Sequence, residues 1–375
     1  MKSLETLKNL SGKTVLLRVD FNVPFSKNKV LDQFRIQAVL PTIAYLLKQG
    51  ATIVIISHAG DDGVQSLAPI TKILNKTFPT VFVNDFRDAP NMFSKKIKVV
   101  LCENIRREKG EKKNTVILSK ALASIADIYV NDAFPVSHRV HASIVGVTKF
   151  LPSYGGLQME KEISRLSQVL QQAQQPFIFL LGGAKFDTKM PLIQKFLSVA
   201  DYVFVGGALA NNFFQSCGYE IGKSLVDPGY NLVSLCNNKK LLLPIDVVVW
   251  NGKKTRICAY NQVHTNETIV DIGIATAHEL EKIVKSAKTV LWNGPFGKYE
   301  NLYGKNGTQY VLKALSKNKK CFSVIGGGDI VAVVHEMKLQ NKFSFVSTGG
   351  GATLEFLTKE TLPGIDALNT TKKKK

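Results

Sequence analysis

Three glycines and an aspartate, Gly326 to Asp329, lie between a predicted strand over 322–325 and a predicted helix that begins at Ile330. Glycine lets the backbone approach a ligand closely, and the first N–H groups of a helix have no partner within the helix. Together with the positive end of the helix dipole, these groups suit a bound phosphate. An aspartate here would repel that phosphate unless a divalent cation lay between them, so Asp329 indicates Mg²⁺ held together with a nucleotide. The alternative is a tight glycine turn in which Asp329 caps the helix.

A second set of polar residues follows the strands predicted in the first half of the chain. This set comprises Asp20, Asn22, Arg35, His58, Arg106 and Arg139, with His138 beside the last of them. Because the carboxyl ends of parallel strands meet along one edge of an open sheet, we expect these side chains to converge. Three guanidinium groups suit a small substrate that carries a phosphate and a carboxylate, and Asp20 and Asn22 suit its hydroxyl. Taken singly, each arginine is more often a member of a surface ion pair.

Glycine-rich stretches recur after the strands predicted in the second half. Gly182–Lys189 follows a strand and opens a helix, so it offers amide groups and the ammonium groups of Lys185 and Lys189 to phosphates. Trp292–Glu300 ends another strand; its glycines and proline suit a flat base pocket, and Glu300 suits ribose hydroxyls. These stretches predict a nucleotide site in this half.

Two common nucleotide-binding motifs do not fit the chain. Gly218–Ser224 is similar to a P-loop, but it is one residue too short and follows a predicted helix, so we exclude it as a phosphate site. The first strand is not followed by a Gly-X-Gly-X-X-Gly turn with an acid on the next strand. This weighs against a dehydrogenase.

Strand and helix signals alternate along both halves of the chain, as in parallel sheets with right-handed crossovers. A stretch rich in proline and glycine, Leu151–Gly156, interrupts the alternation and precedes a long predicted helix over 157–174. The sequence therefore predicts an α/β protein with two Rossmann-like, doubly wound parallel-sheet domains joined by a long helix. We place the boundary between residues 155 and 156 and expect ligands in the interdomain cleft.

The composition is that of a globular protein. Hydrophobic residues make up 45% of the 375 residues, and no apolar run approaches the ~18–20 residues that span a bilayer. The first residues lack the apolar core of a signal peptide, so we expect a cytoplasmic protein with no membrane partner. The five cysteines are odd in number and never form a Cys-X-X-Cys pair, which argues against a disulfide framework and a structural zinc site.

The formal net charge of +20 is high. It is compatible with nucleic-acid binding, but the lysines are spread along the chain in ones and twos. The only dense run, Lys372–Lys375, lies at an end that we expect to be disordered. A solvated basic surface is the commoner outcome, so we expect small anions rather than nucleic acid as ligands.

Nine motifs, in order, make the chain resemble the phosphoglycerate kinase family over nearly its whole length. They are Arg18–Pro24, Ser57–His58, Glu103–Arg106, Asn131–His141, Gly182–Lys185, Trp292–Pro295, Gly326–Asp329, Ser347–Gly351 and Leu362–Ile365. The resemblance implies a monomeric glycolytic kinase that moves the acyl phosphate of 1,3-bisphosphoglycerate to MgADP, reversibly, giving ATP and 3-phosphoglycerate. It also implies a phosphoglycerate-binding domain over 1–155 with a C-terminal return at 357–375, and a nucleotide-binding domain over 156–356.

The resemblance implies a role for particular residues. Those implied to bind phosphoglycerate are Asp20, Phe21, Asn22, Arg35, His58, Arg106 and Arg139. Those implied to bind the nucleotide are Gly183, Lys185, Lys189, Gly207, Asn293, Pro295, Glu300, Gly326, Gly327, Gly328, Asp329 and Ile330, with Asp329 on Mg²⁺. Phosphoryl transfer depends on positioning and on neutralising charge more than on a nucleophile or base. The candidates for that charge are Arg35, Lys185, Lys189, Gly328 and Gly350.

The chain departs from the family pattern at several positions. Asp61 stands where the family usually has an arginine, which removes a phosphate contact and adds repulsion. Ala208 replaces a common glycine, and Ile330 a serine or threonine. These changes predict weaker substrate affinity rather than lost chemistry. The alternative is a catalytically weakened or non-catalytic family member that binds a nucleotide or a partner protein.

Overall fold

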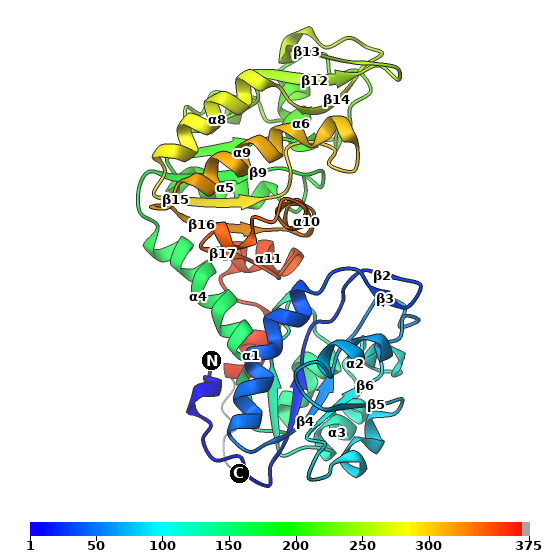
Figure 1. Ribbon diagram of the computed structural model, residues 1–375. Coiled ribbons are helices and arrows are strands. Elements are labelled where there is room, and N and C mark those ends of the chain that lie inside the picture. Colours follow the sequence, from blue (N-terminus) through cyan, green and yellow to red (C-terminus); the bar gives the residue numbers. More distant parts are fainter. Residues whose placement is uncertain (370–375) are drawn as a thin grey trace. The chain divides into compact units, whose positions relative to one another are not determined.

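The computed structural model describes residues 1–369, which form two compact units (Figure 1). The first unit comprises Met1–Ser164 and the segment from Lys359 onward, and the second comprises Arg165–Thr358. Helix α4 (Leu157–Gln172) contains residues of both units. The predicted division between residues 155 and 156 lies just before this helix. The lysine run 372–375 lies outside the described residues.

The first unit is built on a six-stranded parallel sheet with the order β5-β6-β4-β1-β7-β8. Its strands are β1 (Thr14–Arg18), β4 (Thr52–Ile56), β5 (Thr80–Val83), β6 (Val99–Cys102), β7 (Ile128–Asn131) and β8 (Ser153–Gly155). A small hairpin joins β2 (Phe25–Ser26) to β3 (Lys29–Val30). The helices are α1 (Phe34–Lys48), α2 (Ala68–Leu74), α3 (Val116–Ser124) and α12 (Pro363–Asn369).

Both faces of this sheet are covered, which explains the nearly continuous apolar strands. Side chains alternate between the faces, so Val15 and Leu17 belong to one core and Leu16 to another. Residues of α1 and α2 pack into the first core, and residues of α3 pack into the second. Helix α12 returns to this unit, where the Gly364 N–H donates to the Ser137 carbonyl at 2.8 Å.

The second unit has its own six-stranded parallel sheet, with the order β11-β10-β9-β15-β16-β17. Its strands are β9 (Phe177–Leu181), β10 (Tyr202–Val205), β11 (Leu241–Leu242), β15 (Thr289–Asn293), β16 (Phe322–Gly326) and β17 (Phe345–Val346). The helices are α5 (Met190–Val199), α6 (Ala208–Ser216), α7 (Val233–Cys236), α8 (Ile274–Ser286), α9 (Asn306–Lys317), α10 (Gly328–Glu336) and α11 (Gly351–Lys359). The predicted fold class of two parallel-sheet α/β domains is confirmed.

One part of the second unit departs from the predicted alternation. If the alternation held throughout, 241–249 and 267–272 would each add one strand to the parallel sheet, but they do not. The first stretch divides near Pro244 into β11 and β12 (Asp246–Trp250). Strand β12 pairs in an antiparallel manner with β13 (Thr255–Ala259) and β14 (Thr268–Ile272) to form a separate sheet, drawn beside α6 and α8 in Figure 1. Proline cannot donate to a ladder, so a break at Pro244 is expected.

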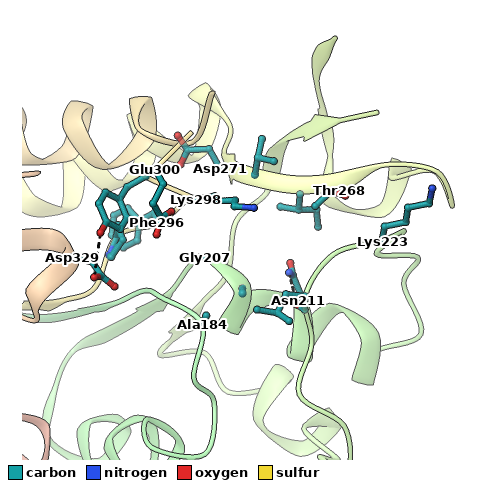
Figure 2. Close-up of a pocket in the computed structure, with 17 residues that line it drawn as sticks. Ala184, Gly207, Asn211, Lys223, Thr268, Asp271, Phe296, Lys298, Glu300 and Asp329 are labelled. Carbon is teal, nitrogen blue, oxygen red and sulfur yellow. Dashed lines mark hydrogen bonds between the residues drawn. The ribbon is translucent and has the colours of Figure 1, made fainter. Parts of the chain in front are cut away.

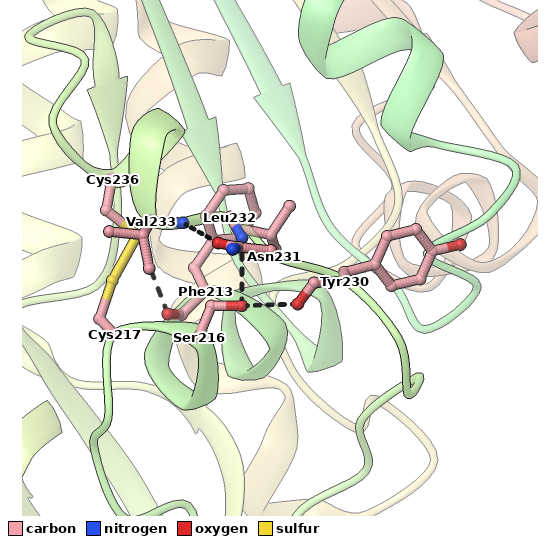
Figure 3. The surroundings of a disulfide bond; sticks show 8 residues. All are labelled: Phe213, Ser216, Cys217, Tyr230, Asn231, Leu232, Val233 and Cys236. Carbon is pink, nitrogen blue, oxygen red and sulfur yellow. Dashed lines mark hydrogen bonds between the residues drawn. A yellow bond between two sulfur atoms is a disulfide. The ribbon is translucent and has the colours of Figure 1, made fainter.

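The sequence argues against a disulfide framework, but two of the five cysteines are paired. Cys217 and Cys236, at the C-terminal ends of α6 and α7, form a disulfide, which Figure 3 shows beside Phe213 and Ser216. The Ser216 hydroxyl donates to the Tyr230 carbonyl at 3.0 Å, which holds the intervening loop against α6. Two cysteines 19 residues apart with no motif between them give no signal in sequence, because only the packing of the two helices brings them together.

The other three cysteines, Cys102, Cys258 and Cys321, are buried and free. Within residues 1–369, every helix falls short of the length or apolar character that a membrane span needs.

Candidate functional site

In the first unit, the predicted cationic residues lie beyond the carboxyl ends of neighbouring strands. His58 follows β4, Arg106 follows β6 in a short 3₁₀ turn, and Arg139 lies in the loop after β7. Arg35 is in the first turn of α1. Strands β1, β4, β6 and β7 are parallel, so their carboxyl ends share one edge of the sheet. The side chains that the sequence predicts to converge are therefore brought to that edge.

Asp20 organises one end of this cluster. Its Oδ2 accepts a hydrogen bond from Arg35 Nη1 at 2.8 Å, and its Oδ1 accepts one from the Asn22 N–H at 3.0 Å. Arg35 Nη1 also donates to the Asn22 carbonyl at 3.0 Å, and Asn22 Oδ1 accepts from the Gly60 N–H at 3.0 Å. The Asp20 side chain is 3% exposed, and that of Arg35 is 25% exposed. Asp20 thus fixes Arg35 while leaving part of the guanidinium open to solvent.

His58 is buried in this cluster and is neutral. Burial holds the pKa of His58 well below its usual range, and the guanidinium groups of Arg18 and Arg106 lower it further. Arg18 Nη2 lies 3.3 Å from His58 Nδ1. His58 Nδ1 also lies 3.6 Å from Asp20 Oδ1, and a neutral imidazole carries a single N–H. His58 can therefore offer a neutral N–H donor to an anionic ligand.

Arg18 contacts this histidine and was not predicted as a site residue. Its Nε donates to Ser143 Oγ at 3.0 Å, and the Ser143 hydroxyl donates to Glu111 Oε1 at 2.6 Å. All three side chains are buried. Burial raises the pKa of Glu111, and the charge of Arg18 acts in the opposite direction. No sequence signal links Arg18 to Glu111, because the hydrogen bonds that connect them run through Ser143, which is distant from both in sequence.

Asp61 lies between two of the predicted substrate-binding arginines. Its Oδ1 accepts hydrogen bonds from Arg106 Nη1 and from Arg139 Nη1, the latter at 3.1 Å. Arg106 Nη1 also donates to the Gly60 carbonyl at 2.6 Å. These arginines lower the pKa of Asp61, the hydrogen bond from Arg139 having the largest effect. Asp61 therefore acts as the counter-ion of these arginines.

Two residues implied to be ligands have apolar side chains that belong to the cores. Phe21 is fully buried, and its N–H donates to Ser57 Oγ at 2.8 Å. Ile330 is fully buried in α10. Their side chains are not available to a ligand.

In the second unit, glycines allow three strand-end loops to cross closely. The Gly182 N–H donates to the Asn293 carbonyl at 2.8 Å, and the Gly183 N–H donates to the Pro295 carbonyl at 2.9 Å. A Cβ on Gly182 would collide with the Pro295 carbonyl, and one on Gly207, which has φ +63°, would lie 2.9 Å from the Gly183 nitrogen. Packing of the loops therefore requires glycine at these positions.

The two predicted lysines of this unit differ in their surroundings. Lys189 is buried, and its ammonium group donates to the Gly182 carbonyl at 2.6 Å. Burial lowers the pKa of Lys189 to about 8, although the charge of Asp329 partly opposes that effect. Lys185 is exposed in the same loop. One lysine is therefore held by the protein and the other is open to a ligand.

A cavity of about 500 Å³ lies at this edge of the second sheet (Figure 2). Four residues implied to bind the nucleotide line it: Gly207, Pro295, Glu300 and Asp329. Figure 2 shows Asp329 and Glu300 at one end of the cavity and Lys223 at the other. The lining also includes residues that sequence reasoning missed: Asn211, Lys223, Asp271, Lys298 and Tyr299.

Some of these missed residues had a signal. Lys223 belongs to the stretch 218–224, which was excluded as a P-loop, and it lines the cavity all the same. Asp271 is the penultimate residue of β14 and accepts from the Ile272 N–H at 2.9 Å and the Gly307 N–H at 2.8 Å. Burial raises the pKa of Asp271 to about 7. This carboxylate fixes the start of α9 beside the cavity.

The glycine-aspartate motif lies as predicted between β16 and α10, but the helix begins earlier, at Gly328. Gly327 has φ +103°, a conformation that favours glycine. Asn293 Nδ2 lies 3.1 Å from the place where a Gly327 Cβ would be, and it is buried with no hydrogen-bond partner among residues 1–369. A buried donor without a partner is costly, so Asn293 fits a ligand that accepts from it.

Asp329 is exposed in the first turn of α10, and its Oδ1 accepts from the Tyr299 hydroxyl at 3.4 Å. Among the described residues, no group of three or more His, Cys, Asp or Glu side chains is placed to hold a metal. Mg²⁺ often takes one or two carboxylates and completes its shell with phosphate and water. A single exposed aspartate beside a phosphate-binding turn fits that mode rather than an all-protein cage.

Gly350, the remaining candidate, directly precedes α11 and has φ +54°. It follows the turn in which the Gly349 N–H donates to Ser347 Oγ at 3.0 Å.

The whole chain is similar to known proteins of one family. The family model for phosphoglycerate kinase matches residues 4–360. The phosphoglycerate kinase of Dictyoglomus turgidum is 39% identical over 384 aligned positions, covering 96% of this chain and 96% of the relative. That of Borreliella afzelii is 38% identical over 391 positions, covering 98% of this chain and 99% of the relative.

Solved structures are similar over the same length. Phosphoglycerate kinase from Coxiella burnetii superposes with a TM-score of 0.83 at 35% identity, covering 98% of this chain and 97% of the other. The Pyrococcus horikoshii enzyme gives a TM-score of 0.84 at 30% identity and covers 98% of both chains. The resemblance read from nine short motifs is therefore confirmed: the chain belongs to the phosphoglycerate kinase family.

Proposed function

We propose that this chain is an active phosphoglycerate kinase. It transfers a phosphoryl group reversibly between 1,3-bisphosphoglycerate with MgADP and 3-phosphoglycerate with MgATP. One observation carries the proposal. A cluster of arginines lies at the edge of the first unit's sheet, and a glycine-lined cavity with Asp329 lies at the edge of the second unit's sheet. An inactive descendant would have no need to retain both.

The first unit binds phosphoglycerate in this proposal. Arg35, Arg106 and Arg139 provide charged donors for its phosphate and carboxylate. His58 is neutral, so it adds no charge that would repel the arginines. Asp20 and Asn22 hold Arg35 in place and remain acceptors for a hydroxyl group.

The second unit binds the nucleotide in the same proposal. The amide groups at the start of α10, together with the exposed ammonium of Lys185, suit the phosphates. Glu300 suits the ribose hydroxyls, and Asn293 Nδ2 offers its unpaired hydrogen to the nucleotide. Asp329 would hold a magnesium ion, whose chemistry is to neutralise the charge on the phosphates.

Chemistry of this kind needs little from the protein beyond position and charge. The transferred phosphoryl group spreads negative charge over three oxygens in the transition state. Arg35, Lys185, Lys189 and the amides of Gly328 and Gly350 are the groups we propose to stabilise that charge. No activated serine or cysteine is required, in keeping with the buried, free state of Cys102, Cys258 and Cys321.

The test is turnover with both substrates. Purified protein should form ADP from MgATP only when 3-phosphoglycerate is present, measured by a coupled assay of the product 1,3-bisphosphoglycerate. MgATP binding without turnover would instead support the non-catalytic alternative.

We also propose that the chain works as a monomer in the cytoplasm, without nucleic acid as a partner; the support is the family resemblance and the scattered lysines. Light scattering should give a mass near 41.3 kDa. Retention on DNA or RNA that falls steeply with salt and competes with ATP would count against it.

A further inference from the structure

The carboxylate of Asp61 connects two arginines that belong to the proposed phosphoglycerate site. Arg106 and Arg139 both direct an Nη1 donor at the same oxygen, Asp61 Oδ1. The Arg106 side chain is 2% exposed, whereas that of Asp61 is 75% exposed. A largely solvated carboxylate is thus shared by two guanidinium groups, one of which is buried, and it offsets one of their two positive charges.

We propose that Asp61 is a built-in occupant of this anion site, which an anionic substrate must displace before it can bind Arg106 and Arg139. Asp61 then determines affinity and selectivity for phosphoglycerate. The inference deepens the function proposed above and depends on it for the identity of the ligand.

Arg107, the next residue after Arg106, is an example of an arginine whose contacts are structural. Arg107 donates to the carbonyls of Gly63 and Val64 at 2.9 and 3.0 Å, and its Nη1 lies 3.0 Å from Glu103 Oε2. Its donors are committed to the backbone and to a buried acid. Arg106, by contrast, has a buried Nε with no hydrogen-bond partner among residues 1–369. A buried donor left without an acceptor indicates that a further anion belongs there.

Displacement of Asp61 is physically reasonable because its carboxylate is already mostly in water. Its pair with Arg139, whose side chain is 37% exposed, is weak and exchanges readily for hydration, and the incoming anion takes over as the partner of buried Arg106. The Asp20 carboxylate, by comparison, is 3% exposed and paired with Arg35, so its release would leave a buried charge. Asp61 can therefore separate from its arginines at a smaller cost in free energy than Asp20 can.

Competition from a carboxylate also selects among ligands. A monoanion offers the two guanidinium groups no more charge than Asp61 does, whereas a phosphate dianion offers more. We therefore expect Asp61 to exclude chloride and simple carboxylates from the site more strongly than it excludes phosphoglycerate.

The experiment compares Asp61→Asn with Asp62→Asn. Asp62 is the adjacent acid, and its Oδ1 accepts from the Val64 N–H at 3.0 Å, a bond that asparagine can keep. Both variants change the net charge equally. Calorimetric titration with 3-phosphoglycerate at fixed ionic strength should show about tenfold tighter binding for Asp61→Asn. Asp62→Asn should stay within about twofold of the parent.

Selectivity is the second measurement. Chloride should inhibit 3-phosphoglycerate binding more strongly in Asp61→Asn than in the parent, while KM for MgATP stays the same in all three proteins. Where the parent binds 3-phosphoglycerate, weaker or unchanged binding in Asp61→Asn would overturn the proposal, since it would mean that Asp61 arranges the arginines for the substrate or lies outside the site.

Titration with inorganic sulfate separates this inference from the proposed function. If the parent neither binds nor phosphorylates 3-phosphoglycerate, yet sulfate binds tighter to Asp61→Asn than to Asp62→Asn, the proposed function fails and the occupancy by Asp61 stands. If the parent turns over and neither anion distinguishes the two variants, the function stands and the occupancy by Asp61 is wrong.

Discussion

Lys189 donates a hydrogen bond of 2.6 Å to the carbonyl oxygen of Gly182, in the loop that links β9 to α5. The lysine is buried, and this lowers its pKa to about 8. Its charge near the proposed phosphate site therefore changes as the pH passes through about 8.

The affinity for MgATP should fall as the pH rises through about 8. Lys189 is charged below its pKa and neutral above it, so phosphates lose an attractive charge at high pH. KM for MgATP should rise by up to about tenfold per pH unit between pH 8 and 9.5. In Lys189→Arg, where the side chain stays charged, KM should be flat over this range. The same rise in both proteins would assign the effect to another group.

Lys185→Ala should reduce turnover far more than nucleotide affinity. The exposed ammonium is proposed to stabilise charge that develops in the transition state, and losing one such group typically lowers kcat by about 10²–10³. We expect KM for MgATP to change less than about threefold. Lys282→Ala, an exposed lysine of α8, controls for the loss of one surface charge. Equal losses in kcat and affinity would reject the role of Lys185.

Asp329→Ala should remove the effect of magnesium on nucleotide binding. Calorimetry with ADP should show tighter binding with Mg²⁺ than with a chelator in the parent, and no such difference in the variant. Tyr299→Phe is the matched control, because it removes only the 3.4 Å contact to the Asp329 carboxylate. A variant that keeps the full magnesium dependence would place the ion elsewhere.

Arg35→Ala should lower both stability and substrate affinity, for different reasons. The change leaves the Asp20 carboxylate, 3% exposed, without its partner. We expect a loss of about 2 kcal/mol in the free energy of unfolding, less than the ~3–5 of a fully buried pair because Arg35 is a quarter exposed.

The double variant Asp20→Asn with Arg35→Ala separates the two effects of Arg35. Urea unfolding should recover most of the lost stability, whereas binding of 3-phosphoglycerate should stay weak. Recovery of binding along with stability would contradict a direct contact of Arg35 with the substrate.

Gly182→Ala should destabilise the second unit through a steric collision. The new methyl group would meet the Pro295 carbonyl, where the loops after β9 and β15 cross. We expect a loss of about 1–3 kcal/mol, measured by urea unfolding. Gly351→Ala is the control, since a Cβ there has nothing within 4 Å and alanine favours the helix α11. Two equally stable variants would contradict the packing argument.

Much of the fold follows from local pattern. Apolar runs such as 14–18 and 177–181 are strands buried on both faces, and a parallel sheet needs that composition. The placement of Arg35, His58, Arg106 and Arg139 at one edge follows from strand direction alone. These features could be predicted because each depends on short segments and one topological rule.

Other features depend on contacts between distant segments. The valine-rich stretch after Pro244 has the composition of a parallel strand, but it is the central strand of an antiparallel sheet, between β13 and β14, that the sequence does not mark. Asp61 was expected to repel phosphate, and nothing in its type indicated that its loop turns the carboxylate onto Arg106 and Arg139. The Lys223 side chain reaches the cavity only because a loop of the second unit folds back.

The bond between Cys217 and Cys236 gives that loop a dependence on its chemical surroundings. The loop carries Lys223 of the cavity wall and Asp227, whose carboxylate accepts from the Phe186 N–H at 2.8 Å, next to Lys185. Disulfides persist where thiols are oxidised and open in a reducing cytoplasm. Opening this one would free a segment whose closure is worth about 3 kcal/mol of chain entropy. The affinity for the nucleotide would then depend on whether the protein is purified with or without a reductant. The two preparations would give different kinetic constants.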